Sequence, residues 1–174
     1  MFNLNFRKLL FNGIWNSGQA GTYPPQFEIP TNIIDINGAT KQIGSSSSSS
    51  EAEQTFNSII HALNRVVKNA VSANEGQSYF KLGTGTTTPT EEDYDIETEA
   101  SDLVINQAMQ TTTATFEKTF NLNITNTGSS TTTLSEVVQV LRVYGNKDIA
   151  ISRTRTAVSF APGETKTITV EVSL

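Results

Sequence analysis

Side chains able to do acid–base, nucleophilic or metal chemistry are scarce in this sequence. The 174-residue chain has one histidine, His61, and no cysteine, so thiolate ligands and most nucleophile–base pairs are missing. No second histidine or carboxylate lies at helical spacing from His61, which we interpret as a structural or exposed residue. We predict no catalytic residue, no metal ligand and no cofactor, and we expect the protein not to be an enzyme.

The densest cluster of charge is an acidic stretch. Paired carboxylates can hydrolyse glycosides, but only when two of them have opposed environments, and a contiguous run in a loop would be uniformly solvated. Asp93, Asp95 and Glu97 have the spacing of part of a calcium loop, yet no glycine follows at the turn position. We interpret the stretch as a solvated loop that folding does not need, with calcium binding as the alternative. Its members are Glu91, Glu92, Asp93, Asp95, Glu97, Glu99 and Asp102.

A pair of glycines, Gly83 and Gly85, follows an apolar segment and raises the question of phosphate binding. A Walker motif needs lysine and serine or threonine after its second glycine, and a dinucleotide motif needs a third glycine that opens a helix. Here three threonines and Pro89 follow, with acidic residues behind them. Acidic neighbours would repel a phosphate, so we predict a tight structural turn.

Arginines gather in one part of the C-terminal half. Arg153 and Arg155 would share one face of a strand, with Arg142 on the strand before it. Two interpretations stay open: a solvated sheet face with modest ion pairs, or a contact between subunits. The acidic residues placed to pair with them across strands are Glu117, Glu136 and Glu171.

Charge and hydropathy argue against several classes of partner. The net charge is −5, and the 12 lysines and arginines form no basic run, so we expect no nucleic-acid partner. No stretch is long enough to be a membrane-spanning helix, so no membrane partner is expected. Asn12 and Gly13 interrupt the apolar residues near the N-terminus, which makes a signal peptide improbable. We also expect no small-molecule substrate.

Most of the C-terminal half has the pattern of β-strands. Between residues 116 and 125, apolar side chains alternate with polar ones, as in a half-buried strand. Further strands are expected over residues 134–144, 149–160 and 168–174, separated by turn residues. Short strands at this spacing predict a mainly β protein with an antiparallel β-sandwich.

A helix is predicted between a serine run and this sandwich. Ser50 and Glu53 have the spacing of a capping box. Apolar residues then recur at helical spacing, so we predict one α-helix over residues 51–72, packed on the sandwich through one face. The residues of that face are Phe56, Ile59, Ile60, Leu63, Val66, Val67 and Ala70.

The first 44 residues combine large apolar groups with repeated glycine and proline. Residues 33–36, Asn37-Gly38 and Ile43 resemble a short hairpin, and the six serines 45–50 indicate a flexible linker. The rest reads as extended chain, whose apolar surface must be buried somewhere. Either it is a strap across its own domain or it is an arm that docks on a neighbouring subunit.

These observations give a division of the chain into an extended N-terminal arm (1–44), a serine linker (45–50) and a helix-plus-sandwich domain (51–174). If the arm docks on a neighbour, its large apolar side chains make the contact. Those predicted interaction residues are Phe2, Leu4, Phe6, Phe11, Trp15, Tyr23 and Phe27.

From about residue 56 onward, the order of motifs resembles a recurrent type of bacteriophage virion protein. The matching segments are Leu82-Gly83-Thr84-Gly85-Thr86-Thr87-Thr88-Pro89-Thr90, Ser135-Glu136-Val137, Ser152-Arg153-Thr154, and Ala161-Pro162-Gly163-Glu164-Thr165 before a final strand. The sequence departs from the pattern after Val137, where Val138-Gln139 replaces the usual Gly-Leu.

The resemblance implies a tail, connector, fibre or head-accessory role and oligomeric assembly in the virion. We therefore expect a structural protein of a tailed virus that associates with itself and with other virion proteins. The alternative is a cell-surface or appendage adhesin with a carbohydrate-binding sandwich. Its loops contain mainly threonine, serine and asparagine rather than aromatic platforms, which argues mildly against the adhesin.

Overall fold

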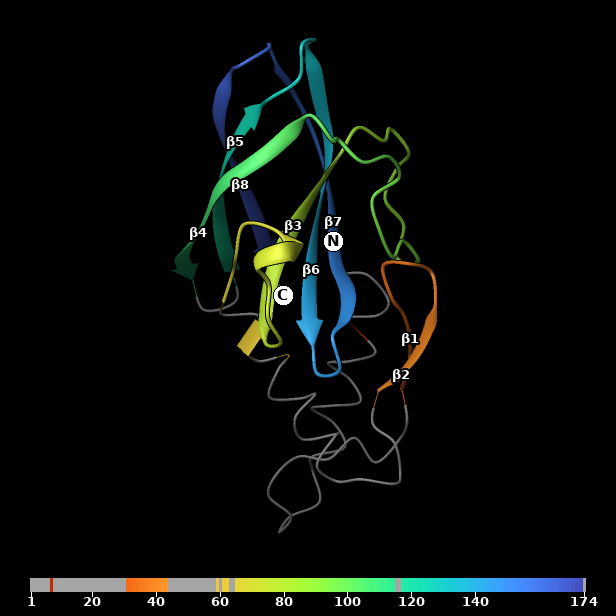
Figure 1. The fold of residues 1–174 in the computed structure, drawn as a ribbon. Coiled ribbons are helices and arrows are strands. Elements are labelled where there is room, and N and C mark those ends of the chain that lie inside the picture. The colour runs from red at the N-terminus through yellow and green to blue at the C-terminus, as the bar shows by residue number, and fades with distance from the viewer. Residues whose placement is uncertain are drawn as a thin grey trace.

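The computed structural model describes residues 7, 31–43, 59, 61–62, 65–114 and 117–173. They form a mainly β protein with two three-stranded antiparallel sheets packed face to face (Figure 1). The mainly β, sandwich-like class predicted from the alternation of side chains is therefore confirmed.

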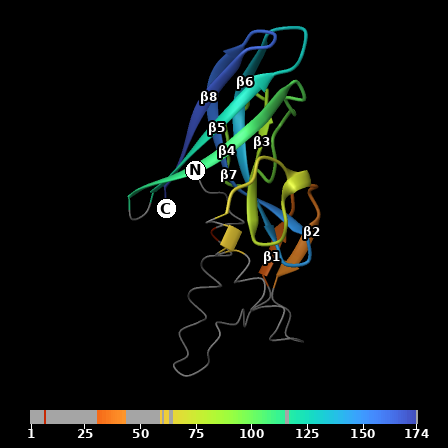
Figure 2. The same ribbon diagram turned by 60° about the vertical axis from the view of Figure 1, so that its left-hand side comes forward.

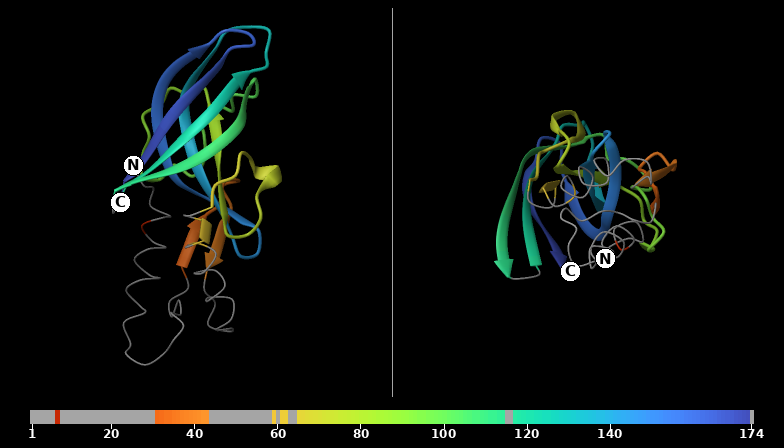
Figure 3. Two further views of the ribbon diagram at one scale, coloured as in Figure 1. Left: turned by 90° about the vertical axis from the view of Figure 1, so that its left-hand side faces the viewer. Right: turned by 90° about the horizontal axis from the view of Figure 1, so that it is seen from below.

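Each sheet is named here after its central strand. The β6 sheet has the order β3 (Gln77–Gly83), β6 (Thr132–Val143) and β7 (Lys147–Phe160). The β5 sheet has the order β4 (Leu103–Ala114), β5 (Glu117–Asn126) and β8 (Thr165–Ser173). Seen from below in Figure 3, β4 and β5 lie on one side of the molecule, and a separate hairpin lies on the other.

The main core lies between the two sheets. Phe120, Leu122 and Ile124 alternate along β5 and are at most 1% exposed, because successive side chains of a strand point to opposite faces. Phe80 of β3 meets Phe120 edge to face, with ring centroids 5.2 Å apart, a favourable aromatic geometry. The rest of the cluster comes from both sheets and from Ala100 in the segment before β4: Leu82, Ala100, Leu103, Ile105, Leu134, Val137, Phe160 and Val170.

The β6 sheet is buried on its outer face as well. A second apolar cluster there contains Tyr79, Val138, Val140 and Ala150, and Ala73 from the preceding loop packs on it. Burial on both faces explains why β6 is an almost unbroken buried run from Leu134 to Leu141, as expected for a strand with two covered faces.

The predicted hairpin is present as β1 (Thr31–Ile34) and β2 (Thr40–Ile43), which pair antiparallel. Gly38 takes a positive φ of 77° in the loop, a conformation that glycine adopts without strain. The Asp35 carboxylate accepts hydrogen bonds from the loop N–H groups of Asn37 and Ala39, both at 2.9 Å. Figure 2 shows the hairpin beside the end of the β6 sheet, where the Ile36 N–H donates to the Asp148 carbonyl at 3.1 Å.

The α-helix predicted over residues 51–72 is not borne out. Ile59, His61 and Ala62 have helical backbone, but no α-helical element is present in the described part of the chain, and 51–58, 60 and 63–64 lie outside it. From Arg65 the backbone is extended, and Val66 forms a parallel bridge with Ser78. Only a 3₁₀ turn, η2 (Ala70–Ser72), follows.

The edge of β3 explains why the helical pattern fails after Arg65. The Ser78 N–H donates to the Arg65 carbonyl at 2.7 Å, and the Val67 N–H donates to the Ser78 carbonyl at 2.8 Å. An edge strand carries unpaired backbone groups, and the β-branched Val66 and Val67 suit an extended segment that pairs with them. None of the helices in the described residues is long and apolar enough to cross a membrane.

Candidate functional site

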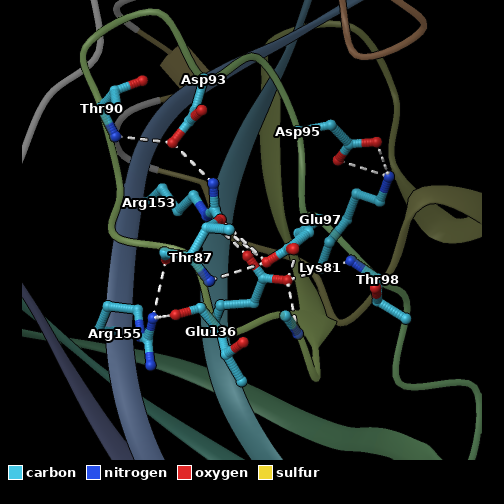
Figure 4. A network of polar contacts seen from close by, with 12 residues as sticks. Lys81, Thr87, Thr90, Asp93, Asp95, Glu97, Thr98, Glu136, Arg153 and Arg155 are labelled. Carbon is cyan, nitrogen blue, oxygen red and sulfur yellow. Dashed lines mark hydrogen bonds and ion pairs between the residues drawn. The ribbon is translucent and has the colours of Figure 1, made fainter.

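A buried ion pair lies at the centre of the outer face of the β6 sheet (Figure 4). Glu136 of β6 is 0% exposed, and Arg153 on the neighbouring strand β7 is 6% exposed. The Arg153 Nε donates to Glu136 Oε2 at 2.7 Å. Buried charges persist when they are paired and hydrogen-bonded, and both of these residues have further partners.

The other oxygen of Glu136 holds a loop that runs from residue 84 to residue 99. Glu136 Oε1 accepts hydrogen bonds from three backbone N–H groups: Gly85 at 3.1 Å, Glu97 at 2.9 Å and Thr98 at 3.3 Å. These donors come from the two ends of the loop. A single buried carboxylate therefore closes the loop through charge-assisted hydrogen bonds.

Arg153 holds the middle of the same loop with its remaining nitrogens. Nη1 donates to Asp93 Oδ2 at 2.7 Å, and Nη2 donates to Thr87 Oγ1 at 3.2 Å. The Glu97 carboxylate lies 3.8 Å from Nη2. The planar fork of a guanidinium can serve several acceptors at fixed angles, so Arg153 joins the loop to the sheet at several points. We call Glu136, Arg153, Asp93, Glu97 and Thr87 the loop clamp.

Two acidic side chains of the clamp, Asp93 and Glu97, are held in their ionised form. Burial alone would raise the pKa of Asp93, but hydrogen bonds from the Thr90 N–H and Arg153 outweigh it, and the pKa lies below its usual value of 3.8. Hydrogen bonds from the N–H and hydroxyl of Thr87, both at 2.9 Å, lower the pKa of Glu97 below 4.5. Both carboxyls thus favour the charged state.

Close approach to Glu136 explains the two glycines. A Cβ atom on Gly83 would lie 2.4 Å from the Glu136 Cγ, and one on Gly85 would lie 2.4 Å from its Oε1. Neither glycine has a positive φ. We predicted that these glycines serve a tight structural turn. The structure gives a different reason for them, because both make room for the buried Glu136 carboxylate.

The interpretation of the acidic stretch as a solvated loop is also wrong in its central part. Asp93 and Glu97 belong to the clamp, and Asp95 lies 2.5 Å from Lys81 Nζ on β3. Glu92 and Glu99 are exposed. Asp93 and Glu97 both lie against Arg153, whereas Asp95 pairs with Lys81. The described residues contain no group of three or more potential metal ligands.

The arginine-rich face is not simply a solvated surface with modest pairs. Arg153 is buried, whereas Arg155 is exposed and donates to the carbonyls of Thr86 and Thr87. Glu171 is exposed on the other sheet, where Thr119 and none of these arginines is its register partner. The Glu117 side chain lies outside the described part of the chain.

Arg142 makes a second clamp further along the same face. Its Nε and Nη2 donate to the Asp148 carboxylate at 2.7 and 2.6 Å, and its Nη1 donates to the Ala70 and Ala73 carbonyls at 3.0 and 2.9 Å. The hydrogen bonds with Asp148 raise the pKa of Arg142 above its usual value. The neighbouring Tyr79 ring is 5.8 Å from the guanidinium carbon, and burial raises the pKa of its hydroxyl.

The remaining predicted residues are placed as follows. His61 has helical backbone and is exposed. Within the arm, Arg7 is described, and its Nη1 lies 2.7 Å from Glu91 Oε1 of the same chain, with side chains that are 54% and 47% exposed. The predicted arm contacts lie outside the described residues: Phe2, Leu4, Phe6, Phe11, Trp15, Tyr23 and Phe27.

Comparisons with known proteins add no relative from which a role could be transferred. No protein-family model, curated protein or solved structure matches the chain. The function must therefore be argued from the sequence motifs and from what this arrangement of side chains can do. The charged residues of the β6 sheet hold two loops onto that sheet.

The sequence contained a signal for the clamp that the strand pattern alone does not reveal. Glu136 stands in a mostly apolar strand, after Leu134 and before Val137 and Val138, and a carboxylate in a doubly buried strand requires a buried partner. In the pairing of β6 with β7, Glu136 lies opposite Arg155. Arg153, its partner in the buried ion pair, is two residues away from Arg155 on the same strand.

Proposed function

We propose that this chain is a structural component of a viral particle, with a tail, connector or head-accessory role. It acts by self-association and by docking on other virion proteins. The observation that carries the proposal is the loop clamp, in which Glu136 and Arg153 lock a long loop onto the sandwich. A scaffold whose charges are satisfied internally suits a rigid structural subunit, and the order of the sequence motifs supports a virion role.

The assembly element in this proposal is the N-terminal arm. Within the arm we assign docking to residues 1–30, because the hairpin that begins at Thr31 already contacts the sandwich of its own chain through Ile36 and Asp148. The Arg7–Glu91 pair is about half exposed at both ends, and exposed pairs of this kind contribute at most about 1 kcal/mol. That pair would not prevent the apolar side chains of the arm from docking on a neighbour.

Deletion of residues 1–30 tests the proposal against the alternative of an intramolecular strap. We expect the shortened chain to melt within a few degrees of the full chain but to lose assembly, measured by light scattering and electron microscopy. A full-length control with Phe2, Phe6 and Trp15 changed to serine keeps the length and removes the apolar anchors, and it should behave in the same way.

Two results would contradict this proposal. A much lower melting temperature after deletion would show that the segment stabilises its own domain. Unchanged assembly of both variants would show that the arm is not the docking element.

A further inference from the structure

The outer face of the β5 sheet is open to solvent in the described structure, unlike that of the β6 sheet. Its side chains come from alternate positions of β4, β5 and β8. The registers place Gln107, Asn123 and Thr167 in one row across the three strands, and Met109, Asn121 and Thr169 in the next. The rows form one continuous surface along three paired strands.

This face is almost free of charge. Among the side chains of this face that the structure describes, the only ionisable one is that of Glu171, at one end. The register adds one more acidic position, Glu117, at the same end, although the chain has 29 acidic and basic residues in total (12 plus 17). Two apolar side chains of β4 are prominent on it, with Val104 41% and Met109 50% exposed. Depletion of charge and exposure of methionine are features of the buried centre of protein interfaces.

The polar groups of the face are held in place by bonds between strands. Asn106 Nδ2 donates to Asn123 Oδ1 at 3.2 Å and to Thr125 Oγ1 at 2.6 Å. The Thr125 and Thr165 hydroxyls are 2.6 Å apart, so this row spans all three strands. Side chains that are already ordered lose less entropy when a partner binds, which favours association.

From these observations we infer that the outer face of the β5 sheet docks on the same face of a second copy of this chain. The argument for a second copy as the partner is one of charge. Copies with a net charge of −5 repel one another through most of their surface, whereas a nearly neutral face lets them meet without placing like charges opposite each other. No described residue of this face is aromatic, so it lacks the stacking platforms expected of a glycan site. The inference rests on the proposed self-association but uses a surface other than the arm.

The size of the face sets the strength of this contact. Nine residues of β8 at about 3.3 Å each, and three strands about 4.8 Å apart, give a surface of roughly 14 by 30 Å, on the order of 400 Å². A standard stable interface buries about 800 Å² on each partner. The contact is therefore weak alone and becomes effective where arms or neighbours hold copies close together.

Opposite charges placed at the centre of the face test the inference. In a twofold contact each residue near the axis meets its own equivalent, and Asn123 lies on the central strand, away from both ends of the face. Full-length Asn123→Glu and Asn123→Lys are each expected to weaken self-association about tenfold or more in sedimentation experiments, because like charges then face each other. An equimolar mixture of the two variants should restore association to within about threefold of the wild type, since opposite charges then meet.

Matched controls separate this contact from general effects of charge. Ala157 is exposed on β7, in the other sheet, so Ala157→Glu and Ala157→Lys should leave association unchanged. Thermal unfolding of all four variants checks that the fold is retained.

Each alternative result overturns the inference in a recognisable way. Unchanged association of both Asn123 variants would show that the face is not a contact, while leaving the arm proposal intact. Weakening without restoration in the mixture would exclude pairing of like faces. A wild-type chain that stays monomeric at every concentration would overturn both this inference and the proposed self-association.

Discussion

The two sheets of the sandwich share one core, but the outer face of one is covered and that of the other is open. The β6 sheet is covered by the 84–99 loop and by the segment before β3, and it contains the buried pair of Glu136 and Arg153. The β5 sheet leaves its outer face exposed and lines it with threonine, asparagine and glutamine. Charge is thus buried where the chain covers itself and is nearly absent where the sheet is open.

A charged residue in a strand therefore need not mark a solvent-facing position. On the β6 sheet, Glu136 accepts hydrogen bonds from backbone N–H groups of the covering loop, and Arg153 donates to the side-chain oxygens of Asp93 and Thr87 in the same loop. A buried charge of this kind is costly without its partners and stabilising only as part of a complete network. On the β5 sheet no loop needs to be held, so neutral polar side chains suffice.

The largest difference between the sheets should appear when a glutamate is removed from each. Glu136→Ala leaves three N–H groups and part of Arg153 without their acceptor, so we expect a loss of about 3–5 kcal/mol in the free energy of unfolding. Glu171→Ala, on the exposed face of β8, should change it by less than about 0.5 kcal/mol. Urea unfolding of both variants measures the two losses. Losses of similar size would contradict the proposed difference between the sheets.

A double-mutant cycle sharpens the explanation of the glycines. Gly83→Ala should cost about 1–3 kcal/mol by overpacking, because all three nearest atoms to the new Cβ belong to Glu136. In a Glu136→Ala background the same change should cost well under half as much, which gives a coupling energy between the two sites. An equal cost in both backgrounds would mean that the glycine serves another purpose.

Acid should weaken the clamp through Asp93 and Glu97. Their pKa values in the folded protein lie below the usual 3.8 and 4.5, so their contribution to stability is complete above about pH 5 and is lost as the pH falls through the folded values. We expect Asp93→Asn to make the stability curve flatter below pH 4.5 than that of the wild type. A wild-type curve as flat as that of the variant would contradict the assignment.

The smallest effect is expected on the open face. Thr167→Ala removes an exposed hydroxyl of β8 and should change the stability of the monomer by at most about 0.5 kcal/mol. Thermal melting at low concentration is the appropriate measurement. A loss above about 1 kcal/mol would show that this hydroxyl is part of the fold rather than of a surface.

Simple alternation in the sequence was sufficient to predict much of the sandwich. The alternation of Phe120, Leu122 and Ile124 with polar residues predicted the inward face of β5. The Asn37-Gly38 pair predicted the position of the β1–β2 loop. The predicted helix failed because helical spacing of valines near residue 66 is local information, whereas the backbone groups of Ser78 that pair with residues 65–67 lie further along the chain, on the edge strand β3.

The loop clamp was out of reach for a related reason. Composition correctly marked Asp93, Asp95 and Glu97 as a charge cluster, but each has its partner on a distant strand, at Arg153 or Lys81. Spacing along the chain cannot show that a loop folds back over a sheet. Two weak signals, a glutamate inside an apolar strand and two closely spaced glycines, become informative only when they are placed in contact.

Hydrogen exchange of the loop amides tests the central claim that the acidic loop is locked onto the β6 sheet. The N–H groups of Gly85, Glu97 and Thr98 all donate to buried Glu136, so they should exchange nearly as slowly as amides in the interior of β6. The exposed Glu92 amide, at the outer turn of the same loop, serves as the internal reference and should exchange quickly. If the three Glu136-bound amides exchange as fast as that of Glu92, the loop is not locked and the account is wrong.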